Sequence, residues 1–140
     1  MRAIGIIEFG GPDALQVLDL PTPEPGPGEV RVRVHAATVN PTDTMMRAGA
    51  QGDRLAKVTT PYIPGMDLAG IVDALGPDLD GRLSIGDRVI GFAIPYAPTK
   101  GAYAEQVVLP AASVVAAPTT VDLTAASTLL MNAMTARLAI

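Results

Sequence analysis

Three side chains are the first candidates for acid–base or metal chemistry: His35, Asp43 and Asp67. His35 is the only histidine, but it alternates with two arginines on the polar side of a predicted strand, which favours a solvent-facing role over catalysis. Asp43 and Asp67 offer carboxylates for a cation, yet two carboxylates without a third ligand make an incomplete metal site. We therefore assign no residue as catalytic and none as a metal ligand from these residues.

The stretch 61–70, Pro-Tyr-Ile-Pro-Gly-Met-Asp-Leu-Ala-Gly, is the element that would hold Asp67 and Met66 in place. Its two prolines fix backbone φ angles and predict an extended approach without strand pairing. Gly65 then allows a sharp turn or a close backbone contact, and the apolar run 68–75 predicts a buried strand. A rigid entry followed by a buried strand predicts fixed side chains, although these ten residues alone favour an ordinary strand start.

A short helix is predicted upstream of this stretch. Asn40 is suited to cap it, Pro41 to be its first residue, and Asp43 to supply the negative charge favoured in a first helical turn. The helix is expected to run to about Arg47 and to end at Gly49. Residues 50–60 are polar and predict irregular structure.

The first 117 residues predict a small barrel or sandwich of short strands. The clearest strand covers 29–39, where valines alternate with polar residues. The 13 prolines and 14 glycines in the chain indicate many close turns between such strands. The other expected strands are 3–7 and 15–20, which would form a hairpin, then 68–75, a strand after the turn at 84–88, 101–109 and 114–117.

The periodicity changes at Asp122, where apolar residues begin to recur at helical spacing. Asp122 is the expected cap, and Asn132 is suited to restart the helix as a second cap. We therefore expect two parts: residues 1–121 as one mainly β domain, and residues 122–140 as a helical segment. The pattern is still running at Ile140, which suggests a longer parent polypeptide.

Composition excludes several functional classes. The 140 residues are 49% hydrophobic with a net charge of −4 and no run of Lys or Arg, which argues against a nucleic-acid partner. With no cysteine there is neither a disulfide nor a thiolate metal site, which suits a reducing compartment. No apolar stretch is long enough to span a bilayer. We expect a soluble, cytoplasmic protein without a membrane partner.

Several short motifs follow one another in order along the chain: Pro-Gly-Pro-Gly-Glu-Val-Arg-Val-Arg-Val (25–34), Val-Asn-Pro-Thr-Asp (39–43), Arg-Ala-Gly (47–49), Pro-Tyr-Ile-Pro-Gly-Met-Asp-Leu-Ala-Gly-Ile-Val (61–72), Gly-Asp-Arg-Val-Ile-Gly (86–91), Gly-Ala-Tyr-Ala-Glu (101–105), Ala-Ala (125–126) and Thr-Ala (135–136). This ordered set resembles the N-terminal, GroES-like catalytic domain of medium-chain dehydrogenases/reductases. The resemblance is greatest to their zinc-free quinone oxidoreductase branch, and it implies a mainly β, partly open barrel with short helices. Its C-terminal helix would lead toward a Rossmann domain, which is absent here because no G-x-G-x-x-G occurs between a strand and a helix.

The resemblance implies a cofactor-facing role for three polar residues. Asn40 would lie near the nicotinamide and its ribose, where its amide can donate and accept; helix capping is its alternative or additional role. Asp43 would steady that loop, or simply compensate the helix dipole. Thr135 would meet the nicotinamide from the C-terminal helix, or occupy an ordinary helix position.

The resemblance also bears on the substrate and the metal. Met45, Met46 and Met66 would line a flat apolar substrate wall, with core packing as the alternative. Zinc-dependent relatives place a cysteine near Asn40 and Gly-His-Glu at the position of 65–67. Amide and thioether groups are poor zinc ligands beside thiolate and imidazole, so no zinc is expected.

Two functions from different classes remain open. The first is the catalytic domain of an NADPH- or NADH-dependent oxidoreductase that transfers hydride from nicotinamide to a quinone or enone without zinc. The missing Rossmann domain would hold most of the cofactor, and the resemblance also allows a homodimer of the full-length protein. The second is a stand-alone GroES-like binding or assembly module without catalytic activity.

Overall fold

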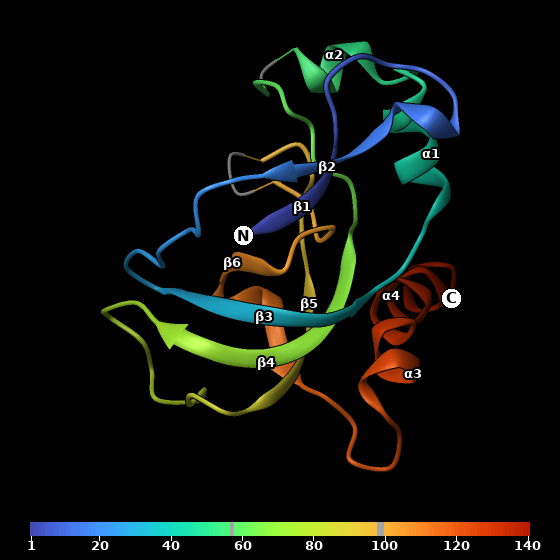
Figure 1. Ribbon diagram of the computed structural model, residues 1–140. Coiled ribbons are helices and arrows are strands. Elements are labelled where there is room, and N and C mark those ends of the chain that lie inside the picture. The colour runs from blue at the N-terminus through green and yellow to red at the C-terminus, as the bar shows by residue number, and fades with distance from the viewer. Residues whose placement is uncertain (57, 98–99) are drawn as a thin grey trace.

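Two antiparallel sheets form the β part of the molecule, as the computed structural model shows for residues 1–56, 58–97 and 100–140 (Figure 1). Strands β1 (Arg2–Ile6) and β2 (Leu15–Asp19) pair as the expected hairpin. The second sheet has the strand order β6-β3-β4-β5-β7. Its strands are β3 (Glu29–Ala37), β4 (Asp67–Leu75), β5 (Arg88–Phe92), β6 (Gln106–Pro110) and β7 (Val114–Ala116). The sheets are open rather than closed, which confirms the predicted mainly β, partly open fold.

The helices are short and lie toward the ends of the strands. Helices α1 (Pro41–Arg47) and α2 (Gly52–Leu55) follow β3, and α3 (Leu123–Ser127) and α4 (Leu129–Leu138) follow β7. Two single 3₁₀ turns, Pro12–Ala14 and Ala111–Ser113, precede β2 and β7. In Figure 1, α4 lies beside the end of β3, on the side to which the chain leaves for α1.

The core sits on one face of the five-stranded sheet and follows the predicted alternation. Val30 and Val32 on β3 are fully buried, while Arg31 and Arg33, which alternate with them, are not. Each such aliphatic side chain contributes roughly 1.5–3 kcal/mol by leaving water. A second buried cluster lies beneath α3 and consists of Ala69, Ile90, Ala117 and Ala126. Helix α3 is therefore packed onto the sheet, and the boundary at residue 121 stays a prediction.

Three expected elements differ from the observed ones. The strand predicted at 101–109 is reduced to β6, because Gly101 and the residues after it instead lie along the 63–65 segment. A Cβ at Gly101 would overlap the Pro64 carbonyl oxygen, so the close approach requires glycine. The region expected to be irregular contains α2, which is stabilised by the burial of Leu55 against Ile6.

Helix α4 does not start at Asn132. It begins at Leu129 after the cap position Thr128, and Asn132 lies inside it with Nδ2 donating to the Thr128 carbonyl oxygen at 2.7 Å. The expected cap of the preceding helix is confirmed, since Asp122 Oδ1 accepts the Ala125 N–H at 2.7 Å.

Candidate functional site

The loop between β3 and α1 places the first predicted site residue, Asn40. Asn40 is the N-cap of α1, Pro41 is its first residue, and Asp43 Oδ2 reaches back to accept the Asn40 backbone N–H at 2.7 Å. This reciprocal arrangement is that of a capping box, and it holds the Asn40 backbone rigidly. The helix ends as expected, with Gly49 at a φ of 74°.

Asp43 is a buried carboxylate rather than a surface partner of the helix dipole. It is 4% exposed, and its Oδ1 accepts the Gly65 N–H at 2.7 Å. The Tyr103 hydroxyl donates to the Thr38 carbonyl oxygen at 3.1 Å and lies 3.4 Å from Asp43 Oδ2. Burial raises the pKa of Asp43, although the backbone N–H donors of Asn40 and Gly65 oppose the rise. Burial and the neighbouring Asp43 also raise the pKa of Tyr103.

Gly65 supplies the turn that brings its own N–H to Asp43. Its φ is 100°, in the region that favours glycine. An added Cβ would lie 2.6 Å from Tyr103 Cδ1 and 2.9 Å from the Ala102 N. The predicted rigid hinge is therefore present, and it is fixed by packing as well as by the flanking prolines.

Asp67 lies where β3, β4 and α4 meet. Its Oδ2 accepts hydrogen bonds from the Thr38 hydroxyl at 2.9 Å and from Asn40 Nδ2 at 3.1 Å. Its Oδ1 accepts the Met131 N–H, in the first turn of α4, at 2.9 Å. A carboxylate at this place satisfies a helix-terminal donor and complements the helix dipole. One buried side chain thus ties Asn40 to α4.

The donors around these two carboxylates bear on metal binding. Each oxygen of Asp43 and of Asp67 already accepts a hydrogen bond from an N–H or O–H group. Among the residues that the structure describes, no group of three His, Cys, Asp or Glu side chains is placed to hold a metal ion. Both carboxylates are thus engaged by hydrogen-bond donors of the protein.

The three methionines occupy different environments. Met46 is fully buried and packs with Ile6 and Leu55 in the cluster beneath α1. Met45 is 45% exposed, and Met66 is partly buried at the entry to β4. Met46 thus has the core role that was the alternative at the sequence level, and the other two still have surface to offer.

Thr135 lies on the exposed length of α4. From Asn132 onward, every residue of this helix is exposed, and Leu138 is exposed by 84%. The structure thus brings Asn40, Asp43 and Asp67 together with the start of α4, while Thr135 lies one turn beyond Met131 on the same helix. Met134, Leu138 and Arg137 line a shallow apolar groove of about 330 Å³ on this helix.

Two residues in this network were not predicted from the sequence: Thr38 and Tyr103. Tyr103 belongs to the Gly-Ala-Tyr-Ala-Glu motif at 101–105, so a signal was present, but nothing in the sequence indicated its partner 60 residues away. Thr38 follows the end of β3 and its hydroxyl points to Asp67 only because β3 and β4 are paired there.

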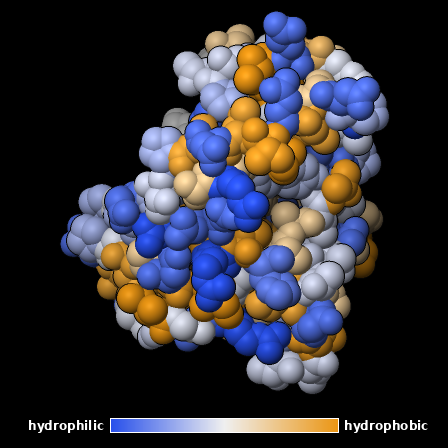
Figure 2. Space-filling view, in the orientation of Figure 1, coloured by the Kyte–Doolittle hydropathy of each residue, from blue (hydrophilic) through white to orange (hydrophobic). Residues whose placement is uncertain are grey.

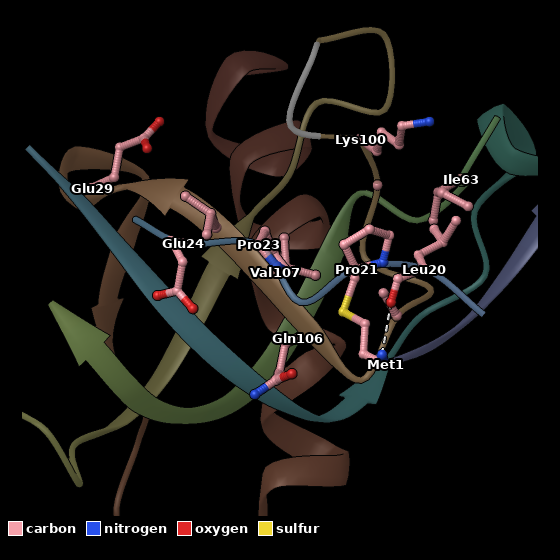
Figure 3. Close-up of a pocket in the computed structure, with 13 residues that line it drawn as sticks. Met1, Leu20, Pro21, Pro23, Glu24, Glu29, Ile63, Lys100, Gln106 and Val107 are labelled. Atoms are coloured by element: carbon pink, nitrogen blue, oxygen red, sulfur yellow. Dashed lines mark hydrogen bonds between the residues drawn. The ribbon is translucent and has the colours of Figure 1, made fainter. Parts of the chain in front are cut away.

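A separate cavity of about 460 Å³ lies beside β6 and the proline-rich connector after β2 (Figure 3). Leu20, Pro21, Ile63 and Val107 line its apolar wall. Near them, the N-terminal ammonium of Met1 donates to the Leu20 carbonyl oxygen at 2.7 Å. None of the predicted site residues lines this cavity, so it is distinct from the Asn40–Asp67 network.

The surface of the molecule mixes hydrophobic and hydrophilic residues (Figure 2). In this view, hydrophobic residues gather in the upper part of the molecule, where α1, α2 and the β1–β2 hairpin lie. Within the described residues, no helix has the length and apolar character needed to cross a membrane.

Comparison with known proteins agrees with this geometry. The family model "Alcohol dehydrogenase GroES-like domain" matches residues 26–119. Quinone oxidoreductase of Mus musculus is 39% identical over 106 residues, which cover 75% of this chain and 30% of that protein. The chain thus spans less than a third of the length of that relative.

Two solved structures share the fold over almost the whole chain. The human synaptic vesicle membrane protein VAT-1 homolog-like protein superposes with a TM-score of 0.89 at 35% identity, covering 100% of this chain and 42% of that one. A mycobacterial protein solved in complex with NADPH has a TM-score of 0.84 at 34% identity, covering 98% and 40% of the two chains. On this evidence the chain belongs to the alcohol dehydrogenase GroES-like domain family, within the medium-chain dehydrogenase/reductase superfamily.

Proposed function

We propose that this chain is the catalytic-domain portion of an NAD(P)H-dependent oxidoreductase that reduces a quinone or an enone without zinc. The similarity to the Mus musculus quinone oxidoreductase supports the reaction class. The similarity to the mycobacterial NADPH complex supports the nicotinamide cofactor. In this proposal a second lobe outside residues 1–140 holds most of the nucleotide.

The observation that carries the proposal is the connection of Asn40 to α4 through Asp67. Asn40 and Thr135 are the residues that the family resemblance assigns to the nicotinamide, and they come from segments far apart in the sequence. One buried carboxylate binds the first of them and the first turn of the helix that carries the second. Such a rigid pair is suited to orient a flat ring, because rigid positioning lowers the entropic cost of reaching a reactive geometry.

The other residues of the site have supporting roles in this proposal. The nicotinamide, when bound, supplies the hydride for a carbon made electrophilic by conjugation with a carbonyl. Asn40 binds the nicotinamide or its ribose, and Asp43 holds the loop around Gly65 in place. Met45 and Met66 form the apolar wall for the acceptor, with Met46 supporting them from the core. The wall excludes water from the reacting carbon.

The donor environment of the two aspartates supports the zinc-free form of the reaction. A cation at Asp67 would have to displace the Thr38 hydroxyl, the Asn40 amide or the Met131 N–H. Met66 stands where zinc-dependent relatives have a histidine. The residues present therefore favour hydride transfer to an acceptor that needs no Lewis acid.

The proposal is tested on the polypeptide that the gene encodes. Oxidation of NADPH and of NADH is followed at 340 nm with 9,10-phenanthrenequinone and with an alkenal, with and without a strong zinc chelator. We expect turnover with at least one acceptor and no loss on chelation. Loss of activity on chelation that zinc restores would refute the zinc-free mechanism.

The full-length protein also distinguishes the proposed enzyme from the alternative, a stand-alone binding module. A stand-alone module would show no dinucleotide binding in a fluorescence titration, but would capture a specific protein whose binding NADPH does not alter. A homodimer remains a prediction of the family resemblance, and a cytoplasmic location remains a prediction from the composition. Sedimentation equilibrium of the full-length protein tests the dimer.

A further inference from the structure

A further cavity, of about 330 Å³, lies between the C-terminal end of α1 and the start of α2. It is lined by Met45, Ala50, Gln51, Gly52 and Arg54. Met45 is one of the methionines that the proposed function places in the apolar wall for the acceptor, so the cavity continues that wall. An acceptor whose reacting carbon lies near the nicotinamide would extend its far end toward this cavity.

The carboxamide of Gln51 has hydrogen-bonding capacity to spare in this cavity. Its Nε2 lies 3.8 Å from Met45 Sδ, and a thioether is a weak acceptor. Its Oε1 is buried and, among the described residues, has no hydrogen-bond partner. A buried amide without strong partners costs free energy. A polar group of a ligand would relieve that cost, and an apolar group would not.

Arg54 brings a positive charge to the same cavity. Its guanidinium carbon lies 5.8 Å from the centroid of the Tyr96 ring, whose face favours a cation there. The Arg54 side chain is exposed, and the ion pairs recorded among the described side chains belong to Arg2, Arg31 and Arg82. The fork of N–H donors on Arg54 can therefore meet a ligand carboxylate without first breaking one of these pairs.

Most of the length of α1 separates this cavity from Asn40. Met45 is in the helix that Asn40 caps, and a helix rises about 1.5 Å per residue, so the two positions are roughly 7–8 Å apart along the axis. A ligand group that meets Arg54 must therefore lie at least one fused ring away from the carbon that receives hydride. A carboxylate beside the reacting carbonyl would lie too close to Asn40 to reach the guanidinium.

We propose that Arg54 and Gln51 form a subsite for a carboxylate at the far end of the acceptor, so that the protein prefers acceptors with a remote negative charge. This inference rests on the proposed function, in which the acceptor lies against Met45. Arg54 is the specificity-determining residue, because it supplies the charge. Gln51 adds one hydrogen bond from its Nε2 group.

The first test compares two acceptors with the full-length protein and a reduced nicotinamide cofactor. The acid 1,4-naphthoquinone-6-carboxylate carries the remote charge, and its methyl ester has the same rings without it. We expect kcat/KM to be about 3- to 5-fold higher for the acid, mainly through a lower KM, which is the upper range for an exposed ion pair. This preference should fall as the ionic strength rises from about 10 mM to about 500 mM. Equal kcat/KM values for the acid and the ester at low salt would overturn the proposal.

The informative variant is Arg54→Gln, with Arg33→Gln as the matched control. Arg33 is exposed on β3 and outside the lining of this cavity, so its replacement removes the same charge elsewhere. The acid should lose its advantage in Arg54→Gln, keep it in Arg33→Gln, and regain part of it in Arg54→Lys, which restores the charge. Equal losses for the acid and the ester in Arg54→Gln would indicate a purely structural role and refute the assignment.

A second measurement needs no turnover. Naphthalene-2-carboxylate and its methyl ester are titrated into the isotope-labelled full-length protein, and NMR follows the Arg54 Nε–H and the Gln51 NH₂ signals. We expect the carboxylate, and not the ester, to shift both signals. Shifts confined to other residues, or no shifts at all, would overturn the inference. Shifts of these two signals in a protein that reduces no quinone or enone would leave the subsite standing and refute the proposed function instead.

Discussion

The structural role of an individual side chain in this domain depends on which groups donate hydrogen bonds to it. Asp43 looks in the sequence like an exposed first-turn acid, yet it is buried and joins Asn40, Gly65 and Tyr103. A buried carboxylate costs free energy unless donors surround it, and here the backbone N–H groups of Asn40 and Gly65 donate to it, with the Tyr103 hydroxyl 3.4 Å from Oδ2. The residue therefore joins separate parts of the loop by hydrogen bonds, and its role toward a cofactor stays a prediction.

The burial of Asp43 predicts a specific pH dependence. Because burial raises its pKa in the folded protein above the ordinary value of 3.8, the folded state binds a proton more readily than the unfolded state does. The contribution of Asp43 to stability is therefore largest below pH 3.8 and falls as pH rises through the raised pKa. Asp43→Asn lacks this titration, so the stability advantage of wild type over Asp43→Asn should shrink as pH rises.

Urea unfolding at several pH values from about 3.5 to about 7 checks this prediction. The exposed Asp13, replaced by Asn, is the control and should not show the shrinking difference. At all pH values Asp43→Asn should be less stable by roughly 1–3 kcal/mol, because one amide oxygen replaces two accepting oxygens. A wild-type advantage that grows with pH would contradict the assigned direction.

Among the elements, the hinge before β4 is the one whose shape the site depends on. Its backbone bends at Gly65, and the bend lies against the Tyr103 ring. Helix α3 is likewise held by few contacts, since Asp122 caps it and Ala126 packs it onto the sheet. Both elements are short, so each depends on one or two contacts.

Replacing Gly65 by alanine should destabilise the chain by more than about 2 kcal/mol, because left-handed backbone and overpacking add together. Gly81→Ala is the matched control, since Gly81 has a φ of 78° but nothing within 4 Å of an added Cβ. The control should cost only about 1 kcal/mol. Urea unfolding of the two variants checks the difference, and equal losses would mean that the contact with Tyr103 is not tight.

The two proposed helix caps can be compared in the same way. Asp122→Ala should lower the free energy of unfolding by about 1 kcal/mol, because the Ala125 N–H loses its acceptor. Asn132→Ala should change it by less than about 0.5 kcal/mol, because Asn132 is inside α4 and exposed. A larger loss in Asn132→Ala would restore the sequence-based view that a helix starts there.

For the whole molecule, the exposed apolar side chains of α4 are the feature that the domain itself does not explain. Met134 and Leu138 are exposed on the same helix, and Leu129 and Ile140 near its ends are exposed as well. Such residues lower the solubility of a protein when they cluster on a solvent-exposed surface. In our proposal they face the cofactor-binding lobe.

This exposure predicts the behaviour of residues 1–140 expressed alone. The chain should enhance the fluorescence of a hydrophobic dye such as ANS. The double variant Met134→Glu/Leu138→Glu should reduce that fluorescence without changing the unfolding midpoint, because these side chains are outside the core. A fall of more than a few degrees in the midpoint would show that α4 is packed in solution.

The sequence by itself determined what depends on neighbouring residues. Helix α1 with its Asn40 cap and Pro41 start, the Asp122 cap and the alternation of β3 all follow from contacts within a few positions. The family resemblance supplied the fold in the same way, because it rests on local motifs in order. The start of α4 was predicted wrongly, because the prediction used a local signal, Asn132, and took no account of contacts with distant residues.

Only the tertiary structure decided which side chains meet. Nothing near Asp67 in the sequence indicates that it accepts from Met131, or that Tyr103 reaches Thr38 and Asp43. Adjacent Met45 and Met46 are chemically identical, yet one is exposed and the other buried, because α1 turns one face to the core. Burial and hydrogen-bond partners depend on long-range packing of the whole chain, and that packing converts two ordinary aspartates into the organising points of the site.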